Sequence, residues 1–199
     1  MDVVIIQYNA GNIESVKNAL LRLGVEAEIT GDHDRIRSAE KVIFPGVGEA
    51  STTMAYLKRE GLDLLIPTLT QPVLGICLGL QLMCSHTEEG DTPCLGIFEE
   101  KVRRFVPQPG MEYITKVPHM GWNTISRLRD GIFDPSLEGQ YVYFVHSYYA
   151  TVGEHTSAVT DYITLFSSGL QKGNFYATQF HPEKSGTVGA AILRNFLRL

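Results

Sequence analysis

The chain has 199 residues, a net charge of −5, 44% hydrophobic residues and 20% charged residues. This composition is typical of a globular domain with a real core. The acidic balance disfavours a nucleic-acid-binding protein, which normally presents a basic face. No apolar run approaches the ~18 residues that a membrane-spanning helix needs.

The cysteines and histidines narrow the class further. Cys77, Cys84 and Cys94 are too few, and odd in number, for a disulfide framework. The six histidines show no metal-ligand spacing, so we expect neither a structural metal nor a cofactor. The segment that begins at Met1 lacks the positive start of a signal peptide. We therefore expect a cytoplasmic protein with one domain over residues 1–199.

The first half of the chain alternates strand-like and helix-like segments. Four short segments, of which residues 3–7 form a continuous apolar run, predict strands: residues 3–7, 26–30, 41–44 and 73–76. After a loop at 8–12, residues 13–23 place apolar side chains on one helical face, and Gly24 ends that helix. A second helical stretch leads to Pro72. This alternation predicts an α/β fold with a mostly parallel central sheet flanked by helices.

The second half is richer in strands. Five segments separated by Gly or Pro predict them: residues 102–106, 141–145, 157–160, 163–167 and 175–180. Residues 188–199 predict a closing helix. Lys101, Arg103 and Arg104 form the densest basic cluster, which a short solvated strand edge explains better than a phosphate site.

The strongest local signal is Gly75-Ile76-Cys77-Leu78-Gly79, between a predicted buried strand and a helix. It has the form of a nucleophile elbow with cysteine in place of serine. Glycines are needed there because side chains would collide where strand and helix meet. The positive end of the helix favours a thiolate. An inert core cysteine is the alternative for Cys77, and it is what we expect of Cys84 and Cys94.

A nucleophilic cysteine needs a base, and His181 is the candidate at the end of the last predicted strand. In extended backbone, residues two apart point the same way, so His181 and Glu183 share a face while Pro182 stiffens the link. Glu183 can then hold one ring nitrogen while the other faces the thiol. A strand end with a surface glutamate is the alternative. Together with the elbow, this segment predicts a Cys77-His181-Glu183 triad.

Amide donors for a tetrahedral intermediate form the third part. The N–H of Leu78, directly after the nucleophile, is one natural donor. The segment Pro45-Gly46-Val47-Gly48 follows another predicted buried strand and can bring a second, from Val47 or Gly48. An ordinary turn is the alternative for this segment. The order Cys, His, Glu along the chain disfavours the α/β-hydrolases, in which the acid precedes the histidine.

Together these motifs resemble the class I, or triad-type, glutamine amidotransferases. The resemblance rests on Gly-Ile-Cys-Leu-Gly-Leu-Gln at 75–81 and His-Pro-Glu at 181–183, and it extends over nearly the whole chain. It implies that glutamine is hydrolysed through a thioester at Cys77. It also implies that the ammonia passes to a synthase rather than to water.

Four further stretches resemble the branch of this family that serves histidine biosynthesis: residues 8–12, 45–48, 118–123 and 143–148. That resemblance implies a heterodimer with a (β/α)₈ cyclase subunit that receives the ammonia. It also implies that six residues bind the amino-acid end of glutamine: Gly48, Gln81, Glu89, His146, Ser147 and Tyr148. Five residues on loops around the site are expected at the cyclase interface: Asn12, Met120, Trp122, Tyr143 and Lys184.

Each of these residues has a simpler alternative. Without the resemblance, Gln81 and Glu89 would be surface residues, Met120 and Trp122 would be core residues, and His146 a satisfied strand-end histidine. Three other functions also remain open at this point. They are a class I amidotransferase for another pathway, a docking module without activity, and a stand-alone γ-glutamyl-type hydrolase.

Overall fold

The computed structural model describes residues 1–8 and 12–199. Most strands join one mixed sheet, in this spatial order: β2 (Glu28–Thr30), β1 (Val3–Ile6), β3 (Lys41–Gly46), β4 (Val73–Cys77), β13 (Phe175–Thr178), β12 (Thr164–Lys172), β10 (Tyr148–Ala150), β7 (Lys101–Arg104), β5 (His86–Thr87) and β6 (Thr92–Pro93). A further strand, β11 (Thr156–Tyr162), pairs with β12. The predicted loop at 8–12 falls mostly on residues 9–11, outside the described residues.

The half of the sheet formed by β2, β1, β3, β4 and β13 is parallel throughout. Its central strands are buried on both faces, as their continuous apolar sequences predict. Because side chains alternate along a strand, Val4 and Ile6 face one side while Val3 and Ile5 face the other. The predicted α/β class and parallel core are confirmed.

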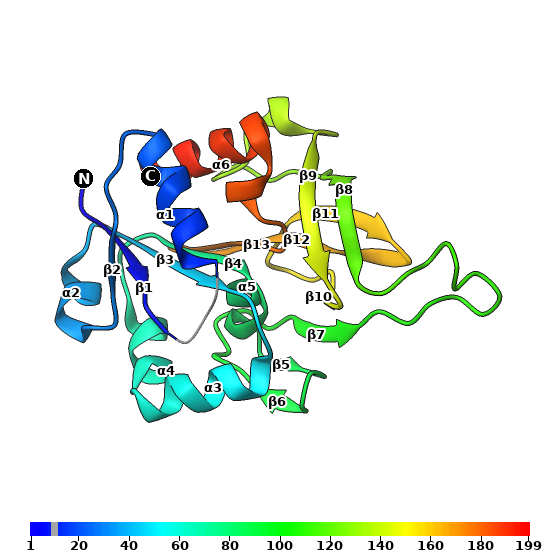
Figure 1. Ribbon diagram of the computed structural model, residues 1–199, viewed down its shortest axis with the longest axis horizontal. Coiled ribbons are helices and arrows are strands. Elements are labelled where there is room, and N and C mark those ends of the chain that lie inside the picture. Colours follow the sequence, from blue (N-terminus) through cyan, green and yellow to red (C-terminus); the bar gives the residue numbers. More distant parts are fainter. Residues whose placement is uncertain (9–11) are drawn as a thin grey trace.

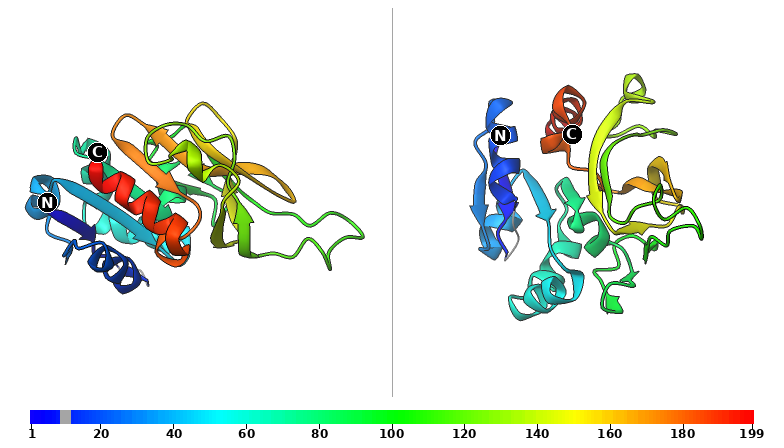
Figure 2. Two further views of the ribbon diagram at one scale, coloured as in Figure 1. Left: turned by 90° about the horizontal axis from the view of Figure 1, so that it is seen from above. Right: turned by 45° about the vertical axis from the view of Figure 1, so that its right-hand side comes forward.

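Helices cover both faces of this parallel half (Figures 1 and 2). The helices α1 (Ile13–Arg22) and α6 (Gly186–Arg198) pack on one face. The other face is covered by α3 (Ala50–Arg59), α4 (Leu62–Leu65) and α5 (Leu78–Met83). Within residues 1–8 and 12–199, no helix is long and apolar enough to cross a membrane.

One short helix, α2 (His33–Ser38), lies where the sequence analysis assigned none. The side chain of Asp32 accepts a hydrogen bond from the N–H of Arg35 and so caps its first turn. Only Ile36 of this helix is buried. A single buried residue gives no helical periodicity, and this explains why the pattern missed it.

The antiparallel half departs from prediction in its details. Strands β11 and β12 are longer than expected, β13 ends two residues early at Thr178, and α6 begins two residues early. Lys101, Arg103 and Arg104 are exposed on β7 as expected. The strand-edge interpretation is wrong, however, because β7 is paired with β10 on one side and β5 on the other.

A separate two-stranded sheet pairs β8 (His119–Thr124) with β9 (Tyr141–His146). The sequence analysis predicted β9 but not β8. The segment between β7 and β8 projects away from the body of the molecule (Figure 1). On the far side of β9, the N–H of His181 donates to the carbonyl of Tyr143. This two-stranded sheet, the β8–β9 hairpin, is therefore hydrogen-bonded to the segment that follows β13.

Candidate active site

Cys77 stands at a strained junction between strand and helix. It is the last residue of β4, and α5 begins at the next residue. Its φ of 55° and ψ of −106° lie in a region that residues with a side chain rarely adopt. Such strain costs of order 1–3 kcal/mol and persists only where the surrounding structure enforces it. The geometry is that of the predicted nucleophile elbow.

The glycines around Cys77 are required by close packing, as predicted. A side chain at Gly79 would collide with the backbone carbonyl of Phe44 on β3. A Cβ at Gly75 would lie 2.8 Å from Sδ of Met83, and one at Gly46 would lie 2.8 Å from Cβ of Leu78. Strands β3 and β4 and helix α5 therefore meet without room for side chains, which fixes where the thiol points.

His181 and Glu183 come together behind Cys77. Nδ1 of His181 lies 2.7 Å from Oε1 of Glu183, and both side chains are buried. The extended link expected across Pro182 is wrong, because Pro182–Lys184 forms a 3₁₀ turn. This turn still brings the carboxylate back onto the imidazole. The amide of Asn12 donates a second hydrogen bond to the same carboxylate oxygen.

The surroundings of His181 favour its protonated form. Burial works against the charged imidazolium, but the adjacent Cys77 and Glu183 outweigh it and raise the pKa of His181 to about 10. In the described part of the chain, Nε2 of His181 is buried without a hydrogen-bond partner. With Nδ1 engaged by Glu183, Nε2 is the nitrogen left to exchange a proton at the thiol.

A cavity of about 340 Å³ lies beside the thiol. It contains every residue predicted to supply an oxyanion donor or to bind glutamine. Its lining is Val47, Gly48, Cys77, Leu78, Gln81, Glu89, Pro118, Val145, His146, Ser147 and Tyr148. His181 and Glu183 lie outside this lining, on the buried side of Cys77. The positions, although not the roles, of the predicted residues thus converge on one site.

Gln81 and Glu89 are held in this wall by backbone groups. The side chain of Gln81 is 5% exposed and donates to the carbonyl of Tyr148 at 2.9 Å. A carboxylate oxygen of Glu89 accepts the N–H of Ala50, at the start of α3, at 2.8 Å. Burial raises the pKa of Glu89. The surface-residue alternative is therefore wrong for Gln81, and Glu89 is half-buried.

His146 belongs to a buried pair rather than standing alone. Its Nδ1 lies 2.7 Å from the carbonyl of Tyr148, and its Nε2 lies 3.0 Å from Nδ1 of His119. Burial lowers the pKa of His119 to about 4 and that of His146 to about 3. Both imidazoles are therefore neutral at physiological pH. His146 is therefore both a hydrogen-bonded histidine at the end of β9 and part of the cavity wall.

The comparisons with known proteins agree with this geometry. The profile of the family described as "Glutamine amidotransferase class-I" matches residues 4–199. The chain belongs to the class I glutamine amidotransferases.

Relatives within this family are similar over their whole length. The chain is 60% identical over 199 residues to "Imidazole glycerol phosphate synthase subunit HisH" of Bacteroides thetaiotaomicron, covering 100% of both chains. It is 44% identical to the protein of that name from Idiomarina loihiensis, covering 98% of that protein. A crystal structure of a glutamine amidotransferase matches with a TM-score of 0.74 at 20% identity, covering 98% of this chain and 97% of that one. This last likeness supports the amidotransferase fold alone.

The five residues predicted at the amidotransferase's partner interface lie outside the lining of the cavity beside Cys77. Met120 is 64% exposed and Trp122 57% exposed, so the core-residue alternative is wrong for both. Met120, Trp122 and Tyr143 lie on strands β8 and β9, not on loops as expected. Lys184 is exposed in the 3₁₀ turn, and Asn12 precedes α1.

Two further residues of the amidotransferase site were not assigned a role from the sequence. Gln179 is fully buried, with its amide nitrogen 3.8 Å from Sγ of Cys77. The hydroxyl of Tyr8 donates to the carbonyl of Pro45, and burial raises its pKa strongly. Gln179 lies only two positions before the His-Pro-Glu motif, a proximity that could have indicated it. Nothing in the sequence around Tyr8 predicts its contact with Pro45 on the neighbouring strand β3.

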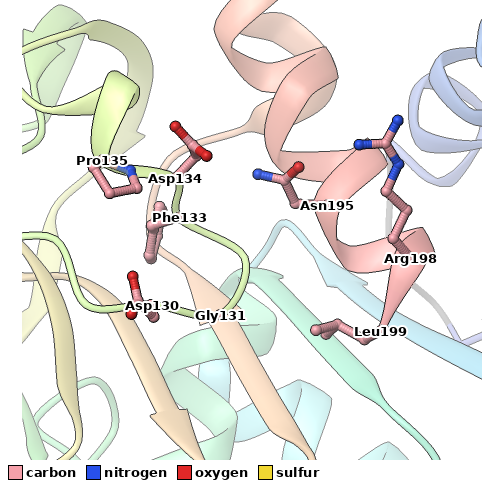
Figure 3. Close-up of a pocket in the computed structure, with 8 residues that line it drawn as sticks. All are labelled: Asp130, Gly131, Phe133, Asp134, Pro135, Asn195, Arg198 and Leu199. Carbon is pink, nitrogen blue, oxygen red and sulfur yellow. The ribbon is translucent and has the colours of Figure 1, made fainter.

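A second cavity lies away from the thiol, near the C-terminal end of α6 (Figure 3). It also measures about 340 Å³. Its lining is Asp130, Gly131, Phe133, Asp134, Pro135, Asn195, Arg198 and Leu199. None of these is a cysteine or a histidine, so this cavity offers neither a thiol nor an imidazole for amidotransferase chemistry. The cavity beside Cys77 is the candidate active site.

Proposed function

We propose that the chain is the glutaminase subunit of an imidazole glycerol phosphate synthase, which releases ammonia from glutamine for a cyclase partner in histidine biosynthesis. The 60% identity to HisH of Bacteroides thetaiotaomicron over the full length supports this assignment. One structural observation carries it. Strand β9 borders the cavity through Val145 and, paired with β8, also carries part of an exposed apolar face. The proposal includes a single domain over residues 1–199 and a cytoplasmic location.

In the proposed first half-reaction, Sγ of Cys77 attacks the side-chain carbonyl carbon of glutamine. The bond from that carbon to nitrogen breaks, and the nitrogen leaves as ammonia with a proton from His181. A thioester remains on Cys77. The N–H groups of Leu78 and Val47 are the proposed donors to the oxyanion of the intermediate. Glu183 holds His181 and stabilises the imidazolium.

Water completes the cycle. His181, now neutral, takes a proton from the water that attacks the thioester, and the thiolate of Cys77 leaves. The product acid ionises at neutral pH, so glutamine and water give glutamate and ammonium overall. The thiolate and the imidazolium are restored, in agreement with the raised pKa of His181. No metal or cofactor takes part in the proposed chemistry.

The far wall of the cavity is the proposed site for the amino-acid end of glutamine. The half-buried carboxylate of Glu89 can pair with the substrate's ammonium group, since a buried opposite charge is a strong partner. Gln81 and Gly48 contribute from the elbow side, and residues His146, Ser147 and Tyr148 from the end of β9 and the start of β10. These roles follow from the lining of the cavity and the family resemblance.

The proposed docking face for the cyclase is the outer side of the β8–β9 sheet. Cross-strand pairing places Met120 opposite Val145 and Trp122 opposite Tyr143, so these side chains share one face. An exposed apolar face of this kind marks a protein interaction site. Asn12, whose amide contacts Glu183, and Lys184, which follows Glu183 in the 3₁₀ turn, extend the proposed interface.

We further propose that docking controls the oxyanion donor at Val47. Glycines flank Val47, and the N–H of Val47 belongs to the peptide that joins it to Gly46, which has no side chain to oppose its rotation. The peptide can therefore turn its N–H toward or away from the intermediate at small cost. One oxyanion donor is worth roughly 10²–10³-fold in turnover. If the N–H of Val47 points at the oxyanion only in the complex, the isolated subunit is idle and the docked subunit is active.

The test is to measure glutamine turnover by the isolated chain, by its complex with the cyclase subunit, and by the complex with the cyclase's own ligand bound. We expect low turnover alone and a rise of roughly 10²-fold or more in the liganded complex. The cyclase product should also form with glutamine as the only nitrogen source. Equal rates in all three states would contradict the gating and favour a stand-alone hydrolase.

A further inference from the structure

Gln179 lies between the nucleophile and the wall of the cavity. Its Nε2 is 3.8 Å from Sγ of Cys77, and its Oε1 is 3.1 Å from Nε2 of Gln81. The side chain of Gln179 is fully buried, and that of Gln81 nearly so. A buried amide must satisfy both its oxygen and its nitrogen, so these two contacts account for both ends of Gln179.

The orientation of the Gln179 amide is dictated by a neighbouring backbone group. The carbonyl of Tyr148 can only accept hydrogen bonds, so the group of Gln81 that lies 2.9 Å from it must be the NH₂. That same NH₂ meets Gln179, which must therefore present its oxygen to Gln81. The NH₂ of Gln179 is left facing the sulfur of Cys77. An inverted amide would set two donors against each other and an oxygen against the thiolate.

The carbonyl at the head of this chain is itself held in place. Nδ1 of His146 donates to the carbonyl of Tyr148 at 2.7 Å, and Nε2 of His146 accepts from Nδ1 of His119. Tyr148 also belongs to β10, which is paired with β7. The direction of every hydrogen bond from His119 to Cys77 is thus determined, and the donor at Gln179 is preorganised.

We propose that Gln179 is a catalytic residue that donates a hydrogen bond from its side-chain amide to Sγ of Cys77 and thereby stabilises the thiolate. This inference rests on the proposed function, in which that thiolate attacks glutamine. A thiolate is a stronger acceptor than a thiol, so the interaction favours the charged form. The Gln179 side chain is fully buried, so water does not compete for its amide. Gln81, which orients the amide without touching the sulfur, is a positioning residue for this purpose.

The direct test is the pH dependence of alkylation of Cys77 by iodoacetamide in the full-length chain, with peptide mapping to separate Cys77 from Cys84 and Cys94. Gln179→Met keeps the length and volume of the side chain but removes the donor. We expect the midpoint of its pH–rate curve to rise by about one pH unit, with about tenfold slower labelling at pH values below the midpoint.

A matched control separates this effect from general damage. Thr178→Val, one residue earlier, removes a buried hydroxyl that donates to the carbonyl of Phe180 and leaves the sulfur untouched. Its pH–rate curve should match that of the wild type. If Gln179→Met fails to fold, as judged by its thermal transition, Gln81→Met provides the second variant. It frees the Gln179 amide to turn, and we expect a smaller rise of the midpoint in the same direction.

The outcomes distinguish this inference from the proposed function. If wild-type Cys77 is no more reactive than Cys94, the assigned nucleophile is wrong and the proposed function fails with it. If wild-type Cys77 reacts readily and the Gln179→Met curve coincides with it, only the role of Gln179 is refuted. Equal shifts for Gln179→Met and Thr178→Val would also refute that role.

Discussion

The parallel half of the sheet and the β8–β9 hairpin bury different kinds of side chain. In β1, β3 and β4, apolar residues fill both faces, and the one charged side chain, that of Lys41, stands at the start of β3. In the hairpin, the buried face carries the histidines His119 and His146, whereas Met120 and Trp122 stand on the exposed face. Strand β8 turns its large apolar side chains outward, the reverse of a strand that only covers a core, whereas β9 buries its apolar residues in the usual way.

Under the proposed function, the difference reflects two separate demands on the molecule. The nucleophile needs a rigid junction that can sustain the strain at Cys77, and the parallel half provides one. A partner surface needs apolar side chains that remain exposed until docking. The two regions meet at Val145, whose carbonyl lies 3.9 Å from Sγ of Cys77. The predictions below test how far the two demands are separable.

The largest expected effect is at the nucleophile. Cys77→Ser should lower glutamine hydrolysis by at least about 10³-fold while the fold stays intact, because serine is a far poorer nucleophile without a strong base. A glutamine-mimicking alkylator should label Cys77 and spare Cys84 and Cys94. Thermal unfolding is the control for the fold. Label on another cysteine would overturn the assignment.

The triad partners should differ in the size of their effects. We expect His181→Ala to lower turnover by roughly 10²–10⁴-fold, as the loss of a general acid–base does. Glu183→Gln should retain more activity, because the amide can still orient the ring. Steady-state turnover in the complex measures both. Equal losses would mean that the pair acts as a unit, and full activity of Glu183→Gln would remove it from the triad.

The exposed face of the hairpin should matter for the partner and not for the fold. Trp122→Ala should weaken cyclase binding by about 30-fold or more, as expected of a central aromatic residue in an interface. Isothermal titration measures the affinity. Leu64→Ala is the matched control, since Leu64 is 76% exposed on α4, away from the hairpin. Equal affinities of the two variants would remove the hairpin from the interface.

The smallest expected effect tests the buried face of the hairpin through pH. Burial lowers the pKa of His119 to about 4, below its ordinary value near 6.5, so the unfolded chain binds the extra proton first as the pH falls. The stability contribution is present above about pH 6.5 and declines toward pH 4. Between pH 7 and pH 5.5, the wild type should lose about 1 kcal/mol more of its unfolding free energy than His119→Gln does. Denaturant titrations at both pH values measure it, and parallel losses in both proteins would contradict the assignment.

Local patterns were sufficient to predict the parallel core. Continuous apolar runs mark strands buried on both faces, and the helical face at residues 13–23 corresponds to α1. The same reasoning missed α2 and β8. Helix α2 is too short to show a period, and β8 alternates in the sense opposite to an ordinary half-buried strand, with its histidine inside and its tryptophan outside. Patterns assume that apolar residues point inward, and β8, with Met120 and Trp122 exposed, breaks that assumption.

The site shows the same division. The sequence by itself determined the elbow at Cys77 and the pairing of His181 with Glu183, because each depends on residues a few positions apart. Only the tertiary structure decided that Gln179 faces the sulfur of Cys77, a contact across 102 residues of chain. Its direction is set by a carbonyl on β10 and a glutamine on α5. Hydrogen-bond directions of this kind depend on groups that meet only when distant strands pair, so no local pattern can contain them.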